Sequence, residues 1–240
     1  MARPYAYIGA AAAQPLTVRT LRPPGSGKGT EDRAVHVPLA AVHAAPRYLL
    51  WDFGNTLADQ RWMWPSPPGA PEWTDRYRAL AGTDLDGRWN RGECTWRDVA
   101  SALTADLAIA PGDVHAHVEQ CCRNVQFFEH AWSVARSRVV PQAIVTVNSD
   151  LFRDLVVPAY ELDTVFDVIV TSGEEHTLDK AELAAVALRR LGGTEPAEAL
   201  LLDDVPANCD AWKARGGRAY LFETDAAFAR DRPWSAPEHA

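Results

Sequence analysis

Asp52 is the side chain of this sequence that is best placed to do chemistry. It follows the apolar run 48–51, Tyr-Leu-Leu-Trp, and Gly54 and Asn55 then break the strand that this run predicts. A buried strand that delivers one carboxylate into a Gly/Asn turn is a costly arrangement. It is usually kept because the carboxylate does chemistry at the carboxyl end of the strand, where open α/β sheets place their sites.

Two further carboxylates, Asp203 and Asp204, follow the apolar run 199–202. With Asp52 they place three oxygen ligands at predicted strand ends, and such a group suits Mg²⁺, which binds carboxylates, waters and substrate oxygens. Lys180 begins a predicted helix and can reach these strand ends to neutralise a phosphoryl oxygen. Taken alone, the Asp pair also fits a helix N-terminus, and Lys180 also fits a solvated surface residue.

The predicted elements alternate in a way that is typical of a parallel α/β sheet with helices on both faces. A helical block over 74–135 separates the first strand from the others, which predicts an inserted helical domain. The expected strands are 47–53, 143–147, 166–172, 199–202 and 219–222, and the expected helices in the second half are 180–191 and 206–215. Thr146 and Asn148, at the end of the second strand, are candidate donors to an anion or simple strand terminators.

Composition limits the kind of partner that the protein can have. Apolar residues make up 47% of the 240, so a sizeable core is expected, and the net charge is −8. An acidic surface argues against nucleic acid and anionic membranes, but one metal ion and one Lys are enough to attract a small phosphorylated molecule. The four cysteines lack zinc-ligand spacing, and no apolar run is long enough for a membrane span, so a cytoplasmic protein is expected.

Residues 1–46 differ from the rest in being rich in Ala, Pro, Gly and Arg, and we expect a poorly ordered or surface-draped extension. Within them, residues 23–30, Pro-Pro-Gly-Ser-Gly-Lys-Gly-Thr, look like the phosphate loop of adenylate kinases. The preceding residues 16–21 form a poor candidate for a buried strand. A flexible Gly-rich segment is therefore the preferred interpretation, and a nucleotide kinase is a minor alternative.

The motifs occur in the order of the four motifs of the haloacid dehalogenase (HAD) superfamily, which the sequence resembles over about residues 47–225. They are Asp52 to Leu57, the strand that ends at Thr146-Val147-Asn148, Lys180, and Leu201 to Asn208 with its Asp-Asp-x-x-x-Asn form. The helical block resembles the C1 cap of that family. The resemblance implies a cap over 58–137 and a Rossmann-like core made of 47–57 and 138–240.

The resemblance also implies a mechanism. Asp52 would attack phosphorus and form an aspartyl-phosphate, which water then hydrolyses. Asp52, Asp203 and Asp204 would hold Mg²⁺, directly or through water, and Lys180 would orient Asp52 and the phosphoryl oxygens. The implied activity is that of a Mg²⁺-dependent phosphatase for a small phosphorylated metabolite, with no expectation for the oligomeric state.

Three residues are expected to bind the substrate: Thr56 in the first motif, and Thr146 and Asn148 in the second. The family usually has Ser or Thr directly before this Asn, and Val147 stands there instead. The phosphate-binding side chain of the second motif is therefore either Thr146 or Asn148. Ala181 also replaces the Pro that often follows the lysine of the third motif.

Gly54 is the main departure, because most phosphatases of the family carry an Asp there that protonates the leaving group. Gly54 keeps the backbone carbonyl that binds the metal and lacks the acid. The expected consequences are a preference for good leaving groups such as acyl phosphates or sugar 1-phosphates, a proton donor from the cap, or the chemistry of haloalkanoate dehalogenases, which also lack this Asp. A catalytically weak module that binds a ligand or partner is a further alternative.

Overall fold

The computed structural model describes residues 45–63 and 65–235. Its centre is a parallel five-stranded sheet in the order β5-β4-β1-β6-β7. The strands are β1 (Tyr48–Trp51), β4 (Gln142–Thr146), β5 (Val168–Thr171), β6 (Ala199–Asp203) and β7 (Arg218–Leu221). The first strand of the sequence thus lies in the middle of the sheet, between β4 and β6. This confirms the predicted α/β class.

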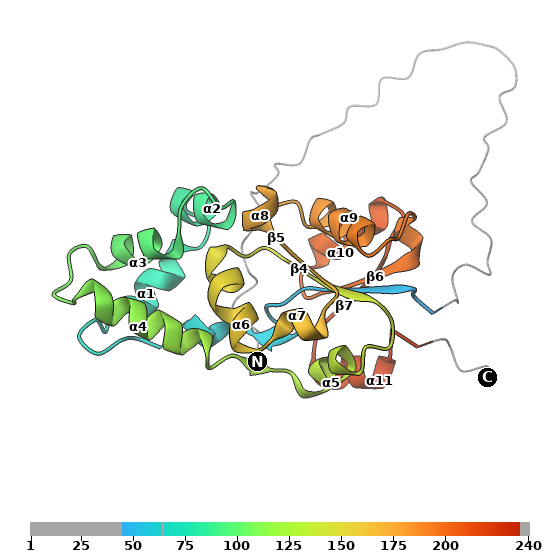
Figure 1. Cartoon of the computed structure of the whole chain (residues 1–240), viewed down its shortest axis with the longest axis horizontal. Helices are drawn as coiled ribbons and strands as arrows, with labels where there is room; N and C mark the ends of the chain where they lie inside the picture. Colours follow the sequence, from blue (N-terminus) through green and yellow to red (C-terminus); the bar gives the residue numbers. More distant parts are fainter. Residues whose placement is uncertain (1–44, 64, 236–240) are drawn as a thin grey trace, which may run out of the picture.

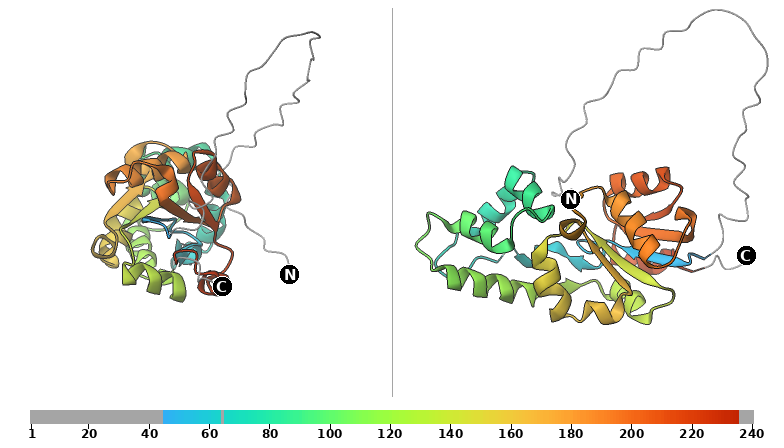
Figure 2. Two further views of the ribbon diagram at one scale, coloured as in Figure 1. Left: turned by 90° about the vertical axis from the view of Figure 1, so that its right-hand side faces the viewer. Right: turned by 45° about the horizontal axis from the view of Figure 1, so that its top comes forward.

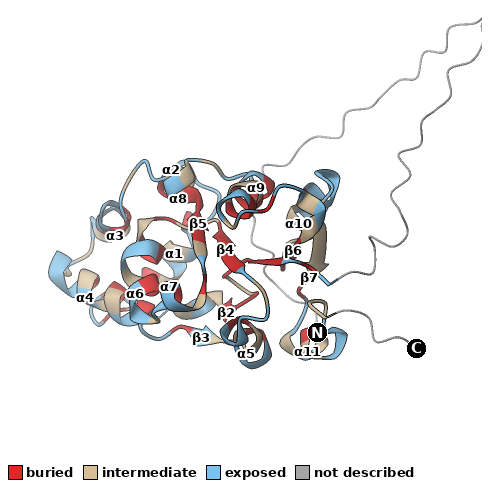
Figure 3. Ribbon diagram, turned by 45° about the vertical axis from the view of Figure 1, so that its right-hand side comes forward, coloured by how far each residue is buried: buried red, intermediate tan, exposed pale blue. Residues whose placement is uncertain are grey.

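Alternation along β1 divides the core between the two faces of the sheet. Tyr48 and Leu50 pack with the face covered by α9 (Lys180–Arg190) and α10 (Pro206–Ala214). Leu49 and Trp51 pack on the opposite face. Figure 1 shows α9 and α10 on one side of the sheet, and α5 (Glu129–Ser137), α7 (Leu162–Val165) and α11 (Asp225–Asp231) on the other. The buried strands run between these layers in Figure 3.

Short helices complete the α/β part of the chain and follow the strands closely. They are η3, a π-helix (Phe152–Val156), α6 (Val157–Ala159), α8 (Ser172–Glu175) and η4 (Pro196–Glu198). The strand and helix positions agree with the predicted ones to within two residues at most ends. None of the helices in the described part of the chain is long and apolar enough to cross a membrane.

A group of helices lies beside the sheet and is inserted between β1 and β4, as the pattern predicts (Figure 2). Its members are α1 (Trp73–Leu80), α2 (Asp84–Asn90), α3 (Trp96–Thr104) and α4 (Pro111–Cys122). Thr95 caps α3 and forms a capping box with Asp98. We refer to α1–α4 as the cap.

Two short strands join the cap to the core and were not predicted. β2 (Ala58–Asp59) pairs antiparallel with β3 (Gln126–Phe127), and η2 (Gln60–Met63) follows β2. Two-residue strands carry too little periodicity to be recognised in a sequence, and their pairing spans more than sixty residues. The chain after the first motif therefore forms a strand and a helical turn before it reaches the cap.

α5 lies within the predicted cap range 58–137 but packs on the core. Its first turn is held by Asp225 of α11, whose carboxylate accepts from the backbone N–H groups of His130 at 3.0 Å and Ala131 at 2.9 Å. The division between cap and core remains a proposal, and this packing favours an end of the cap near β3. The phosphate-loop-like residues 23–30 lie outside the described residues.

Direct contacts hold the cap against the core. Asp150, which follows β4, accepts from the Trp89 indole N–H at 3.0 Å and from the Trp96 backbone N–H at 3.0 Å. Beside them the backbone of Gly92, between α2 and α3, lies against Gly173 of α8. A Cβ atom at residue 92 would come within 2.3 Å of the Gly173 carbonyl oxygen, and Gly92 has φ +71°. The cap is therefore in close backbone contact with the core at this point.

We expect Gly92→Ala to lower the free energy of unfolding by more than about 2 kcal/mol, because it combines a left-handed backbone with a backbone clash. Gly112→Ala is the matched control, since Gly112 lies in α4 with nothing near its Cβ position. That variant should be neutral or up to about 1 kcal/mol more stable. Urea denaturation of both variants checks this, and equal stabilities would contradict the close contact.

Candidate active site

The three carboxylates predicted to form a site come together at the carboxyl edge of the sheet. Asp52 directly follows β1 and is 8% exposed, Asp203 ends β6 and is fully buried, and Asp204 is half-buried. One ligand oxygen from each lies within 4.8 Å of the others. The structure therefore contains the compact group of oxygen ligands that the sequence predicted.

The pairing of β1 with β6 explains why these carboxylates meet. The register aligns Trp51 with Leu202, and the Asp52 N–H donates to the Leu202 carbonyl at 2.8 Å. Leu50 and Leu201 both face α9 and α10, so the alternation of strands directs Asp52 and Asp203 to that same face. The first residue of α9 lies on this side.

That residue is Lys180, and it joins two of the carboxylates. Its side chain is 3% exposed, with Nζ at 2.5 Å from Asp52 Oδ1 and 3.2 Å from Asp203 Oδ2. Asp179 caps α9 by accepting from the N–H groups of Ala181 and Glu182, and so fixes the helix start that carries Lys180. Lys180 is thus buried in the site rather than solvated on the surface.

Asparagines hold Asp203 and Asp204 in place. Asn208 Nδ2 donates to both oxygens of Asp203, at 3.0 and 3.2 Å, and the Val205 N–H donates to Asp203 Oδ1 at 2.9 Å. Asn55 Nδ2 donates to Asp204 Oδ2 at 3.2 Å from a left-handed backbone, φ 55°. Asn55 and Asn208 belong to the quoted motifs, but their contacts with the two carboxylates were not predicted.

Burial and the neighbouring charges shift the pKa values of the ionisable groups in the site. Burial raises the pKa of Asp52 to about 7, with Lys180 opposing the shift and the charges of Asp203 and Asp204 adding to it. Burial, followed by the charge of Asp203, also raises the pKa of Asp204. Burial lowers the pKa of Lys180, but Asp203 and Asp52 outweigh it and the net direction is upward. The site thus holds more negative charge than the ammonium balances.

The three predicted substrate-binding residues are placed differently. The Thr56 side chain is fully buried, and its hydroxyl has no hydrogen-bond partner among the described residues. Thr146 ends β4, next to β1 in the sheet, and its hydroxyl accepts from Asn148 Nδ2 at 2.8 Å. Thr146 and Asn148 are therefore joined by a hydrogen bond. The two candidates for binding phosphate form a pair and cannot be treated as independent alternatives.

Gly54 lies two residues beyond Asp52, and the structure places a neighbour there that the sequence did not indicate. A Cβ atom at residue 54 would be 3.5 Å from Gln60 Cβ and 3.6 Å from Gln60 Oε1. Both are ordinary van der Waals distances, so a Cβ atom at this residue meets no clash among the described residues. The proximity depends on how the chain folds back after Gly54, which composition and spacing do not reveal.

Comparison with protein-family models and with curated proteins gives no match. Solved structures are similar. A predicted HAD-like family hydrolase from Porphyromonas gingivalis is 16% identical over 79% of this chain and 98% of its own, with a TM-score of 0.53. The chain has the HAD-like fold.

Other solved structures share this HAD-like fold. L-2-haloacid dehalogenase from Xanthobacter autotrophicus is 17% identical over 78% of this chain and 82% of its own, with a TM-score of 0.56. A HAD family enzyme from Bacteroides thetaiotaomicron in complex with magnesium and inorganic phosphate is 12% identical over 73% of this chain and 93% of its own, with a TM-score of 0.53. At these identities the likeness concerns the fold alone, and the neighbours include both phosphate-bound and dehalogenating members.

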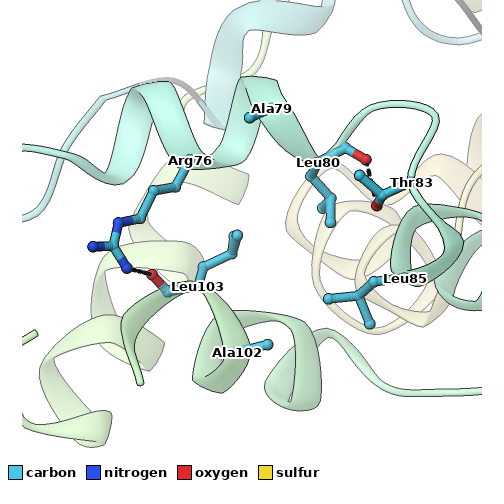
Figure 4. A pocket seen from close by; sticks show the side chains of 7 residues that line it. All are labelled: Arg76, Ala79, Leu80, Thr83, Leu85, Ala102 and Leu103. Atoms are coloured by element: carbon cyan, nitrogen blue, oxygen red, sulfur yellow. Dashed lines mark hydrogen bonds between the residues drawn. The ribbon is translucent and has the colours of Figure 1, made fainter. Parts of the chain in front are cut away.

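A separate hollow lies on the cap of this HAD-like structure, between α1, α2 and α3 (Figure 4). It has a volume of about 430 Å³ and includes none of the site residues above. Arg76 is its charged residue, and its guanidinium already donates to the Leu103 carbonyl at 3.0 Å and pairs with Asp106. The hollow is therefore apolar and distinct from the carboxylate cluster.

Two roles are open to the tryptophans of 62–73: they could stack on a substrate, or they could clamp cap and core together. Trp73 is buried in the apolar cluster, and its indole N–H donates to the Met63 carbonyl at 3.0 Å. Trp62 packs against the same cluster, which favours the clamp for these two. Trp64 lies outside the described residues.

Lys180→Met should lower the free energy of unfolding by about 3 kcal/mol or more, because Asp52 and Asp203 lose the ammonium that compensates their buried charges. Lys213→Met is the control, since Lys213 is half exposed and lies 3.6 Å from the exposed Asp210. Its expected cost is at most about 1 kcal/mol. Urea denaturation at neutral pH measures both, and a small loss for Lys180→Met would contradict the compensating role.

Proposed function

We propose that the protein is a Mg²⁺-dependent hydrolase that cleaves a small phosphorylated molecule through an aspartyl-phosphate on Asp52. The observation that carries the proposal is the buried cluster in which Lys180 lies 2.5 Å from Asp52 and 3.2 Å from Asp203, with Asp204 beside them. If all three carboxylates are ionised, they carry two more negative charges than the ammonium of Lys180 balances. One divalent cation would balance them.

The donor set fits Mg²⁺, which prefers oxygen ligands and tolerates few protein carboxylates. Asp203 already accepts from Lys180, Asn208 and Val205, whereas Asp52 and Asp204 each accept one side-chain hydrogen bond. Asp52 and Asp204 would therefore be the direct carboxylate ligands, with Asp203 orienting the site and the Gly54 carbonyl as a further ligand. When bound, the metal supplies charge stabilisation for the transferring phosphoryl group.

The residues of the chain divide the remaining work. Asp52 would attack phosphorus, and Lys180 holds the carboxylate at Oδ1 so that its other oxygen is directed to the substrate. The Thr56 hydroxyl, which is buried and has no hydrogen-bond partner among the described residues, would donate to a phosphoryl oxygen, as would the joined pair Thr146 and Asn148. Together these residues would position the phosphoryl group. Positioning and charge stabilisation are the main tasks of a protein in phosphoryl transfer.

Gly54 restricts the substrate class. Residue 54 offers no acid to protonate a departing oxygen, so a leaving group that is stable as an anion is expected, such as an acyl phosphate or a sugar 1-phosphate. The net charge of −8 supports a small metabolite rather than nucleic acid as the ligand. A cytoplasmic location remains a proposal from the cysteine usage.

A dehalogenase is the second candidate, favoured by Gly54 and by the fold shared with L-2-haloacid dehalogenase. Halide departs as an anion and needs no proton, and a carboxylate such as Asp52 can displace it. Asp204 beside Asp203 supports the phosphatase instead, because attack on carbon does not need a metal. A ligand-binding module without turnover is the third possibility.

Asp52→Asn should abolish Mg²⁺-dependent phosphate release from 4-nitrophenyl phosphate and from a panel of acyl and sugar phosphates, because the amide cannot serve as nucleophile. Native activity should disappear with EDTA and return with Mg²⁺. Halide release from 2-chloropropionate is assayed in parallel. Phosphate release that survives in Asp52→Asn would rule out the nucleophile, and halide release alone would favour the dehalogenase.

Gly54→Asp should raise the rate for phenyl phosphate by about 10-fold or more and change the rate for dinitrophenyl phosphate little, because only the poor leaving group needs a proton. Among the described residues, a Cβ at residue 54 meets Gln60 at ordinary contact distance, so a side chain can begin there without a clash. Gly54→Asn is the matched control, with the same shape and no acid. A plot of log kcat/KM against leaving-group pKa should become flatter only in Gly54→Asp, and an unchanged slope would contradict the missing acid.

A further inference from the structure

Gln60 is held next to Gly54 by a tight return of the chain after Asp52. Gly54 forms a bridge with Ala58, the Asn55 N–H donates to the Ala58 carbonyl at 2.6 Å, and the Ala58 N–H donates to the Phe53 carbonyl at 3.0 Å. Two residues later Gln60 begins η2. Because these backbone hydrogen bonds fix the loop, the main chain places Gln60 beside Gly54.

The carboxamide of Gln60 lies on the Asp52 side of the chain. In an extended segment residues 52 and 54 direct their side chains to the same side, and residue 53 points the other way. Phe53 is buried and packs edge-to-face on Phe152, with ring centroids 4.7 Å apart. A side chain at residue 54 would therefore extend toward the site, and Gln60 Oε1 lies 3.6 Å from its Cβ position.

Within 45–63 and 65–235, the Gln60 carboxamide makes no hydrogen bond to another side chain or to the backbone, and the residue is half-buried. Its neighbours in sequence are different: Asp59 and Arg61 pair with one another at 2.8 Å. A half-buried amide with one acceptor and two donors that is left open beside Gly54, two residues after the proposed nucleophile, is suited to hold a water molecule.

We infer that Gln60 is a positioning residue that orients the water that hydrolyses the phosphorylated Asp52. The inference rests on the proposed function and deepens it, because it assigns the placement of the attacking water to a residue at the junction between core and cap. An amide does not exchange protons near neutral pH, so Gln60 directs the water and does not deprotonate it.

Hydrolysis of the aspartyl-phosphate can proceed without a general base. The water oxygen forms a bond to phosphorus as the bond between phosphorus and the Asp52 oxygen breaks, and the electron pair returns to the carboxylate. Both protons of the water remain with the inorganic phosphate, which releases one to solvent. Gln60 therefore acts on the second half-reaction only, and formation of the aspartyl-phosphate does not depend on it.

The test is stopped-flow kinetics of the full chain with Mg²⁺ and 4-nitrophenyl phosphate. Gln60→Leu should lower kcat about 100-fold through misplaced water and leave kcat/KM unchanged. It should also show a burst of about one nitrophenolate per enzyme molecule before the slow phase. Gln60→Ala should behave alike, and Gln126→Leu, a control on the neighbouring strand β3, should retain native kcat.

The outcomes separate the inference from the proposed function. A joint fall of kcat and kcat/KM would mean that Gln60 supports folding or substrate binding, and an unchanged kcat would mean that it has no role; either result overturns the inference and leaves the phosphatase standing. The absence of phosphate release by the native protein from every ester would overturn the proposed function and the inference with it.

Discussion

The ammonium of Lys180 lies between Asp52 and Asp203, the carboxylates that end neighbouring strands of the sheet. All three side chains are buried, so each would carry a large desolvation cost without the others. Parallel pairing of β1 with β6 brings the acids together, and the capped start of α9 supplies the base. The sheet register and the position of α9 therefore depend on one another through this contact.

The same cluster explains how stability and function oppose each other at this edge of the sheet. One ammonium cannot balance three carboxylates, and the pKa of Asp52 is raised to about 7 as a result of burial and of the nearby acids. An apolar set of residues would serve folding better. The arrangement becomes reasonable when a divalent cation or an incoming ligand shares the charge, which is why excess negative charge is informative here.

The junction between core and cap lies next to the carboxylate site along the chain. The chain leaves β1, forms the turn that contains Gly54 and Asn55, and returns through β2 to place Gln60 beside Gly54. Asn55 from the same turn also supports Asp204. Because Asp150 of the core holds the indole of Trp89 and the start of α3, the cap is attached to the strand that carries Thr146. A displacement of one of these segments would therefore alter the position of the others.

By itself, the sequence determined the elements and the residue types of this protein. Apolar runs that end in Asp52 and Asp203 predicted strands and a carboxylate site, since a buried strand of four or five residues has a strong local signature. The helix that begins at Lys180 was predicted for the same reason. Tertiary structure decided the contacts: that Lys180 is buried rather than solvated, that Asn208 and Asn55 hold the acids, and that Thr146 and Asn148 are joined. It also decided that Gln60 lies over Gly54 and that α5 packs on the core. These features depend on the pairing of segments far apart in the chain and on a turn of positive φ, neither of which has a periodic pattern in the sequence.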